Sequence, residues 1–343
     1  MDRRPLGTAG PAVSRIAFGN SLTAGNQLDD EAATACVRAA LEAGITTFDT
    51  ADVYADGRAE ELLGAALAST PRDQVVICTK VGRGAGGQSG GPGGLARNRI
   101  RERLDASLRR LGTDHVDLYQ AHLHDDATPL EETMRGFADA VEAGKVRYVG
   151  VSEWSAGEIT EAARLAGELG VPLVSNQPQY NLLWRVPEPE VFPACAELGI
   201  GQMVWSPLAG GVLTGKYAPG GALPAGSRAV AAEGGGVSLR RWDFLRDEVL
   251  ERVRGVERLA AAAGLTLPQL ALAWVLHAPR VTCAVIGASR PEQIGRNLAA
   301  LDVALEPELL ARIDDVLGDV VVRDPALTLS VMLRARRAAA AAA

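Results

Sequence analysis

The chain has 343 residues, of which 47% are hydrophobic, and its formal net charge is −7. This hydrophobic content supports a large folded core, and the acidic balance argues against nucleic acid as a partner. No apolar run reaches the roughly 18 residues of a membrane span, and no leader pattern follows Met1, so we expect a cytoplasmic protein with no membrane partner.

The chain begins with a short hairpin and a strand. Residues 4–6 and 12–13 flank a glycine turn, and Ile16–Gly19 is the first candidate barrel strand. From there helices and strands alternate. Helices are predicted at 31–42, 60–68, 100–111, 130–143, 157–169, 191–198, 243–263, 267–276 and 292–300. Strands are predicted at 45–48, 75–78, 116–119, 146–151, 173–175, 203–205 and 282–286.

Strict alternation of this kind predicts a parallel sheet with helices outside it. Eight strands in about 300 residues match a single α/β domain, a (β/α)8 TIM barrel with an N-terminal β-hairpin and long βα loops. The rival fold, a doubly wound sheet, usually carries G-x-G-x-x-G directly after its first strand, whereas Gly19-Asn20-Ser21-Leu22 follows here. We expect residues 1–318 to form the barrel and residues 319–343 to form a C-terminal tail that is partly helical, frayed or disordered.

Two glycine-rich stretches interrupt the alternation. In the first, residues 82–94, the run Gly82-Arg83-Gly84-Ala85-Gly86-Gly87 is similar to a dinucleotide-binding loop. No predicted helix starts there, so we interpret this stretch as a loop at the barrel rim. The second stretch, residues 209–240, has the length of a lid or of a disordered segment.

Side chains with useful chemistry stand at the ends of predicted strands. They are an acid, a phenol, an ammonium group and an imidazole: Asp49, Tyr54, Lys80 and His122. These groups can converge only if the strands close into a barrel, and together they suit a carbonyl reduction. We expect Tyr54 to donate a proton, the Lys80 charge to lower the pKa of Tyr54 below its usual value near 10, and Asp49 to orient Lys80. His122 would then hydrogen-bond the substrate oxygen.

Each of these residues has a more ordinary interpretation when taken alone. A loop tyrosine usually packs on the surface, and an Asp–Lys pair is usually structural. His122 has two alternatives: it is an ordinary core histidine, or the neighbouring His124 is the functional one instead. Asp125 and Asp126 raise the question of a metal, but no third ligand with compatible spacing is evident and we expect none. A Ser-His-Asp hydrolase would carry a G-x-S-x-G motif at a strand-to-helix turn, and none is present there. The four cysteines form no C-x-x-C pair, so we expect buried free thiols.

Taken together, the motifs resemble those of the aldo-keto reductases, in order from Arg4 to about Leu317. They are Phe48-Asp49-Thr50-Ala51-Asp52-Val53-Tyr54, Thr79-Lys80-Val81, Gln120-Ala121-His122, Gly150-Val151-Ser152-Glu153-Trp154, Gln177-Pro178-Gln179-Tyr180-Asn181, Trp205-Ser206-Pro207-Leu208 and Ile286-Gly287-Ala288-Ser289. Residues 53–60 and 208–217 are most similar to the branch that contains the potassium-channel β subunits and their bacterial relatives.

The resemblance implies a (β/α)8 barrel that binds NADPH in an extended form without a Rossmann domain. It implies a catalytic tetrad with Tyr54 as general acid, made of Asp49, Tyr54, Lys80 and His122. It also implies contacts to the nicotinamide carboxamide from Ser152 and Gln177, and stacking on the nicotinamide by Trp205. It implies pyrophosphate contacts from Ser206, Leu208, Gly210 and Lys216, and a cofactor-phosphate contact on the lid from Arg228. The adenosine end is matched by Gly287, Ser289, Gln293 and Asn297, with Ser289 near the 2′-phosphate. Two positions depart from the usual pattern, namely Glu153, where Asn or Arg is usual, and Arg296, where glutamate is common.

The charge pattern supports a phosphorylated cofactor. Cationic residues flank the late loops of this acidic chain, namely Lys216, Arg228, Arg290 and Arg296. We therefore expect an NADPH-dependent oxidoreductase that reduces a small-molecule aldehyde or ketone to an alcohol.

Two alternatives stay open. One is a cofactor-binding regulatory subunit with little turnover, and His122 argues against it because the channel subunits replace this histidine. The other is a ketoreductase dedicated to a sugar or polyketide intermediate, which differs only in its substrate. The sequence also leaves open whether the chain forms a homo-oligomer.

Overall fold

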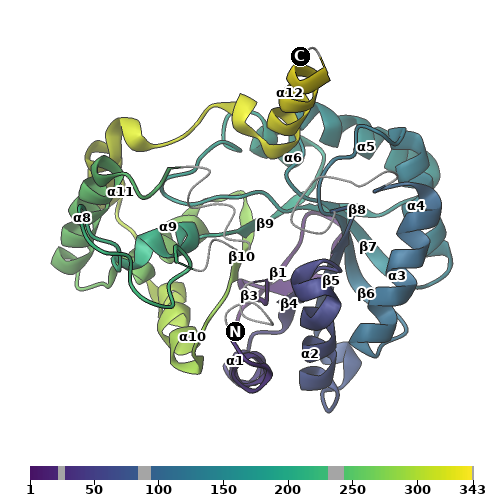
Figure 1. Cartoon of the computed structure of the whole chain (residues 1–343), viewed down its shortest axis with the longest axis horizontal. Coiled ribbons are helices and arrows are strands. Elements are labelled where there is room, and N and C mark those ends of the chain that lie inside the picture. Colours follow the sequence, from purple (N-terminus) through teal and green to yellow (C-terminus); the bar gives the residue numbers. More distant parts are fainter. Residues whose placement is uncertain (22–27, 84–93, 231–242, 342–343) are drawn as a thin grey trace.

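Eight parallel strands close into a barrel at the centre of the molecule (Figure 1). The computed structural model describes residues 1–21, 28–83, 94–230 and 243–341. The barrel strands are β3 (Ile16–Gly19), β4 (Thr47–Asp49), β5 (Val76–Val81), β6 (Val116–Ala121), β7 (Val146–Val151), β8 (Leu173–Asn176), β9 (Gly201–Trp205) and β10 (Val281–Ile286). They pair in chain order, and β10 pairs with both β9 and β3 to complete the circle. The predicted (β/α)8 TIM barrel is confirmed.

Helices follow the strands and pack around the outside of the barrel (Figure 1). They are α1 (Asp30–Glu42), α2 (Arg58–Leu67), α3 (Arg97–Leu111), α4 (Leu130–Glu142), α5 (Ala156–Leu169), α6 (Val191–Glu197), α8 (Asp247–Ala262), α9 (Leu267–His277), α10 (Pro291–Leu298), α11 (Pro307–Leu317) and α12 (Leu329–Ala341). Asp29 caps α1 by accepting a hydrogen bond from the Ala32 N–H at 2.8 Å.

The predicted N-terminal hairpin is also present and closes one end of the barrel. Its strands are β1 (Arg3–Pro5) and β2 (Ala12–Ser14), and they pair antiparallel. The Ser14 N–H donates to Thr47 Oγ1 at the start of β4, and the Thr8 N–H donates to the Gly199 carbonyl just before β9. Since these contacts lie at the amino ends of the strands, the carboxyl ends form the open mouth where this fold places its chemistry.

Besides a small cluster of Ala33, Ala59 and Leu62, two main apolar cores result from this arrangement. The smaller one joins side chains of the barrel strands to residues beside the hairpin turn and consists of Leu6, Val13, Ala17, Cys78, Leu118, Val174, Met203, Cys283 and Val285. The larger core fills the space between the barrel and the helices. All four cysteines are buried and free, as expected.

The structure differs most clearly from the predicted elements at β5 and α11. β5 continues to Val81, so Lys80 lies inside a strand rather than after it, because the polar pair Thr79-Lys80 conceals the end of the strand. Helix α11 was not predicted, although its apolar positions have helical spacing and Pro307 lies in its first turn. The tail is partly helical, as one of the predicted alternatives had it, and the first residues of α12, Leu329 and Ser330, are buried.

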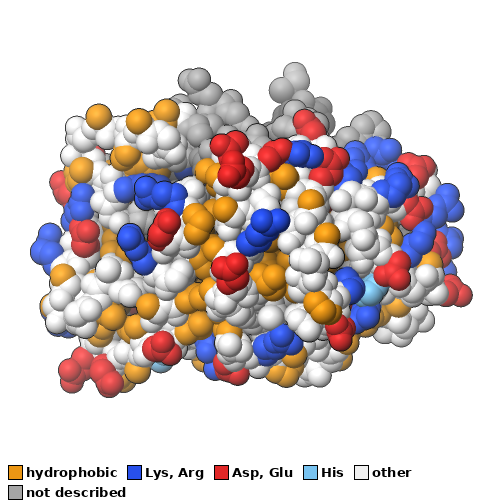
Figure 2. Space-filling model, turned by 90° about the horizontal axis from the view of Figure 1, so that it is seen from below, with side chains coloured by type: hydrophobic (Ala, Val, Ile, Leu, Met, Phe, Trp, Pro, Cys, Tyr) orange, Lys and Arg blue, Asp and Glu red, His pale blue; other side chains and the backbone are white. Residues whose placement is uncertain are grey.

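The described surface carries mixed charge on the face drawn in Figure 2, where basic and acidic side chains are interspersed. Among the described helices, no single one is both long and apolar enough to cross a bilayer. Only the pair α8 and α9, bent by 90°, reaches that length and composition together.

Candidate active site

The predicted catalytic side chains lie at the mouth of the barrel. Asp49 is the last residue of β4, Lys80 lies near the end of β5, and His122 directly follows β6. Tyr54 begins a short 3-10 turn after β4. Parallel strands bring their carboxyl ends to one side of a barrel, and the structure brings all four side chains together there.

Lys80 links these residues. Its ammonium group donates to Asp49 Oδ2 at 2.6 Å and to the Thr50 carbonyl at 2.8 Å, and it lies 3.5 Å from the Tyr54 hydroxyl. The Tyr54 and His122 rings are 5.6 Å apart at 83°, an edge-to-face arrangement. A buried ammonium therefore connects a carboxylate to a phenol, with an imidazole beside the phenol.

The charges at this site are set by burial and by the Asp49–Lys80 pair. Burial alone would lower the pKa of Lys80, but the charge and hydrogen bond of Asp49 outweigh it and the pKa is raised. Burial raises the pKa of Tyr54 above 10, and the Lys80 charge offsets only part of that shift. The expectation that Lys80 brings this pKa below its usual value was wrong for this structure, because desolvation of the phenol is larger. Tyr54 thus keeps its proton at neutral pH, as a proton donor must.

His122 is neutral at physiological pH. Burial holds the pKa of His122 well below its usual value, and the charges of Arg83 and Lys80 lower it further. Arg83 Nη1 lies 3.5 Å from His122 Nε2. The sequence interpretation missed Arg83 because it falls in the glycine-rich rim stretch, of which residues 84–93 lie outside the described residues.

Two predicted carboxamide-binding residues join the same network. Gln177 Nε2 donates to Asp49 Oδ1 at 2.9 Å, and Ser152 Oγ donates to the Gln177 carbonyl at 2.8 Å. Both side chains are buried at the ends of β8 and β7. One carboxylate oxygen of Asp49 therefore accepts from Lys80 and the other accepts from Gln177, and the two hydrogen bonds fix its orientation.

Strained backbone gathers at the barrel mouth. Six non-glycine residues of the described chain have positive φ, and five of them follow barrel strands: Ala55, Asp56, Glu153, Ser206 and Ala209. Such conformations cost about 1–3 kcal/mol each and persist where surrounding contacts impose them. Their concentration here indicates a site shaped for a ligand rather than for stability.

The predicted pyrophosphate segment forms a tight turn after β9. Ser206 Oγ accepts a hydrogen bond from the Gly210 N–H at 3.1 Å, and both glycines at 210 and 211 have positive φ, in the 3-10 segment Ala209–Thr214 that follows Leu208. Only residues without a Cβ adopt this path at low cost. The turn therefore has the backbone needed to approach a bound group closely.

Two predicted cofactor cations lie near each other beyond this turn. Burial lowers the pKa of Arg228 to about 10, and burial together with the Arg228 charge lowers the pKa of Lys216. Among the described residues, no carboxylate contributes to either shift. Two partly desolvated cations without a compensating acid fit a phosphate group. Residues 231–240 of the predicted lid lie outside the described residues.

The predicted adenosine-binding residues lie around the start of α10. The Ser289 N–H donates to Gln293 Oε1 at 2.8 Å, and Asn297 is buried on the same helix. Gly287 precedes them, directly after β10. Arg290 and Arg296 are exposed here. A helix N-terminus with an adjacent arginine suits an anion.

The departure at Glu153 has a structural explanation. Its side chain is buried, and Oε1 accepts hydrogen bonds from the Gln179 N–H at 2.6 Å and from Trp205 Nε1 at 2.9 Å. Glu153 therefore holds the predicted nicotinamide-stacking side chain. The sequence could not show this because Trp205 lies 52 positions away.

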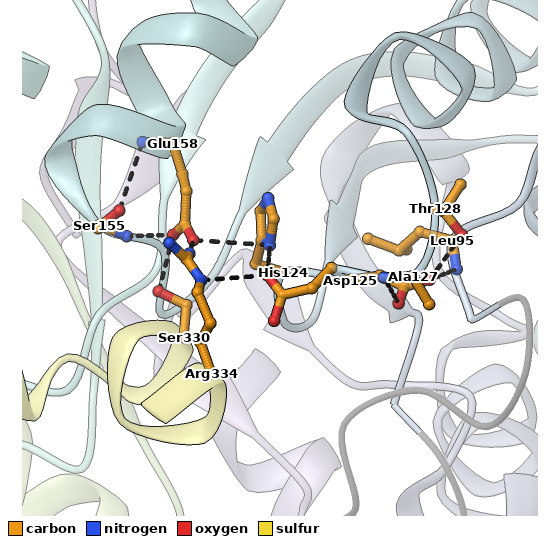
Figure 3. A network of polar contacts seen from close by, with 10 residues as sticks. Leu95, His124, Asp125, Ala127, Thr128, Ser155, Glu158, Ser330 and Arg334 are labelled. Carbon is orange, nitrogen blue, oxygen red and sulfur yellow. Dashed lines mark hydrogen bonds and ion pairs between the residues drawn. The ribbon is translucent and has the colours of Figure 1, made fainter. Parts of the chain in front are cut away.

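The acidic residues near His124 form a cluster with a cation (Figure 3). His124, Asp126 and Glu158 offer ligand atoms within 4.8 Å of one another. Arg334 of α12 pairs with Glu158 and, at 3.3 Å, with Asp126. A guanidinium thus already compensates these carboxylates, and the absence of a metal stays a prediction.

Another buried acid, Asp52, lies between β4 and Tyr54. Asp52 is 4% exposed, its nearest cation is Arg103 at 3.8 Å, and burial raises the pKa of Asp52 to about 7. An unfolded aspartate has a pKa near 4, so the folded chain binds more protons between about pH 4 and pH 7. Stability should therefore fall as the pH rises through that window.

We expect Asp52→Asn to remove most of this loss of stability at high pH. The variant should be about 2–4 kcal/mol more stable than the parent chain at pH 8 and nearly equal to it at pH 4. Urea unfolding at the two pH values measures the difference. A gain that is the same at both pH values would mean that Asp52 does not titrate in this range.

Comparisons with known proteins agree with this geometry. The model of the Aldo/keto reductase family matches residues 15–317. A protein of Oryza sativa subsp. japonica named "Probable voltage-gated potassium channel subunit beta" is 42% identical over 323 residues, which cover 92% of this chain and 96% of that protein. An Arabidopsis thaliana protein of the same name is 41% identical over 328 residues, covering 92% of this chain and 97% of that protein. The resemblance predicted from the motifs, including its branch, is confirmed.

Proposed function

The chain belongs to the aldo/keto reductase family, and from this premise we propose that it is an NADPH-dependent oxidoreductase that reduces an aldehyde or ketone to an alcohol. The observation that carries the proposal is the Lys80 ammonium, which joins Asp49 to the Tyr54 hydroxyl beside His122 at the barrel mouth. We also propose that it acts in the cytoplasm on a small molecule.

Each of these side chains has one task in the proposed reaction. When bound, NADPH supplies the hydride that the carbonyl carbon gains. Tyr54 gives its phenolic proton to the carbonyl oxygen, and the phenolate that remains is stabilised by the nearby Lys80 charge. Neutral His122 donates a hydrogen bond that orients the oxygen before proton transfer. Asp49 keeps Lys80 charged and in place.

The residues described above fit NADPH. Ser152 and Gln177 would hold the carboxamide, Trp205 would lie against the nicotinamide ring, and the turn from Ser206 to Gly210 would follow the pyrophosphate. Lys216 and Arg228, which have no compensating carboxylate within the described part of the chain, support phosphate binding on the late loops.

We expect NADPH to bind at least about tenfold more tightly than NADH, a difference of about 1.4 kcal/mol. The additional phosphate of NADPH would meet cationic residues and the start of α10 beside Ser289. Titration of intrinsic fluorescence with each cofactor measures the two dissociation constants. Equal constants would remove the phosphate site from the proposal.

A screen tests the reaction itself. Loss of nicotinamide absorbance should follow addition of NADPH with a panel of aldehydes, ketones and keto-sugars. A compound of the panel that supports turnover also helps to decide whether the chain is a ketoreductase dedicated to one sugar or polyketide intermediate. A panel without turnover, despite tight NADPH binding, would contradict the proposal.

The second candidate function is a cofactor-binding regulatory subunit. The printed names of the similar rice and Arabidopsis proteins favour it. His122 and its contacts with Tyr54 and Arg83 favour catalysis instead, since a subunit that only senses the cofactor does not need a group to orient a carbonyl.

A further inference from the structure

Glu153 receives hydrogen bonds from three separate parts of the chain. Its carboxylate accepts from the Gln179 N–H at 2.6 Å and from Trp205 Nε1 at 2.9 Å, and its backbone carbonyl accepts from the Ser330 N–H of helix α12. The side chain is buried, and the backbone has φ of 60°. A buried carboxylate is stable only while its donors are present, so the side-chain donors and the backbone contact together fix the position of Glu153.

Helix α12 is docked at the same point through its first turn (Figure 3). The Ser330 N–H donates to the Glu153 carbonyl at 3.2 Å, and Ser330 Oγ donates to Glu158 Oε2 at 2.7 Å. One turn further on, Arg334 pairs with Glu158 and Asp126. The C-terminal helix therefore contacts the loop after β7 and the first turn of α5, both at the barrel mouth.

We propose that Glu153 is a positioning residue that couples the docking of α12 to the orientation of the Trp205 ring. The inference depends on the proposed function, in which that ring lies against the nicotinamide. The indole N–H has Glu153 as its acceptor, so the ring follows the carboxylate. The backbone of Glu153 in turn is held from the other side by the Ser330 N–H. Release of α12 would therefore loosen the ring that the proposed function places against the nicotinamide.

A single donor can be removed to test this. Ser330→Pro deletes the N–H at the second position of α12, in the first turn, where N–H groups have no partner within the helix and where α9 already carries Pro268. Ser330→Ala is the matched control, because it also loses the hydroxyl that donates to Glu158 but keeps the N–H.

Two measurements on each variant separate the coupling from the reaction. The first is the indole N–H resonance of Trp205 in chain labelled with ¹⁵N-tryptophan, assigned through Trp205→Phe. The second is the dissociation constant for NADPH. We expect Ser330→Pro to move the resonance relative to Ser330→Ala and to weaken NADPH binding by about fivefold, the effect of one backbone hydrogen bond.

The same pair in a Glu153→Asn background shows whether the effect passes through Glu153. Asparagine tolerates the positive φ but has too short a side chain to reach both partners. There the proline and alanine variants should match in both measurements. An unchanged resonance, or an equal loss of affinity in both backgrounds, would overturn the coupling.

Failure of the unmodified chain to bind NADPH would count against the proposed function instead. The Trp205 resonance would then still decide whether Glu153 links α12 to the ring. A resonance that moves without any loss of NADPH affinity would overturn the link to the cofactor and leave the proposed function intact.

Discussion

Replacement of Tyr54 with phenylalanine should reduce the rate of carbonyl reduction by about 10²–10⁴, the usual contribution of a positioned acid. The change keeps the ring that lies against His122 and removes only the hydroxyl, 3.5 Å from Lys80 Nζ. NADPH affinity should barely change, because the proposed cofactor contacts lie at Ser152, Gln177 and Trp205. Steady-state rates and a cofactor titration on the same preparation measure both effects.

Tyr119→Phe is the matched control for this experiment. Tyr119 is fully buried in strand β6, and its hydroxyl donates to the Ile100 carbonyl at 3.3 Å. Loss of that hydroxyl should change stability slightly and leave the reduction rate within about threefold of the parent chain. If Tyr54→Phe retained the parent rate, another group would have to supply the proton.

Replacement of Lys80 with methionine should reduce both turnover and stability. The ammonium partly offsets the effect of burial on the pKa of Tyr54 and would stabilise the phenolate, so its loss should slow reduction by about 10² or more. Asp49, 4% exposed, would also remain buried without its charge partner. Breaking a buried pair in this way costs about 3–5 kcal/mol of unfolding free energy.

Lys145→Met gives the control for the stability effect. Lys145 pairs with Asp105 at the same distance of 2.6 Å, but both side chains are more than a third exposed, and such pairs contribute about 0–1 kcal/mol. Asp49→Asn added to Lys80→Met should recover much of the lost stability and none of the activity. If the single Lys80 variant unfolds at the same urea concentration as the parent, Asp49 is not held as a buried charge.

The Tyr54 and Lys80 changes should not add in the double variant. Both act on one proton transfer, so the doubly substituted chain should be scarcely slower than Tyr54→Phe alone. Independent losses that multiply would indicate that Lys80 contributes to the reaction by another route.

The sequence predicts most of the fold because the barrel repeats a local pattern. Each strand and helix carries its own periodicity, and the placement of Asp49 and His122 follows from where their strands end. The error at Tyr54 arose from a different source. A position in the sequence gives the distance to the strand end but not the depth of burial, and burial determines the pKa of that phenol.

Contacts that depend on the path of the chain between elements could not be predicted. Ser330 meets Glu153 only because the irregular segment after α11 returns α12 to the barrel mouth, and that segment has no periodic pattern. Arg83 was missed for a similar reason, since its glycine-rich surroundings suggested a loop without chemistry.

The most direct test of the proposed activity is deuterium transfer. NADPH carrying deuterium at the transferable C4 position is mixed with the chain and the carbonyl panel, and the products are analysed by mass spectrometry. The proposal predicts an alcohol with one deuterium on the former carbonyl carbon, formed about 10²–10⁴ times more slowly by Tyr54→Phe. Tight binding of NADPH with no deuterium in any product would contradict it and would favour the regulatory subunit.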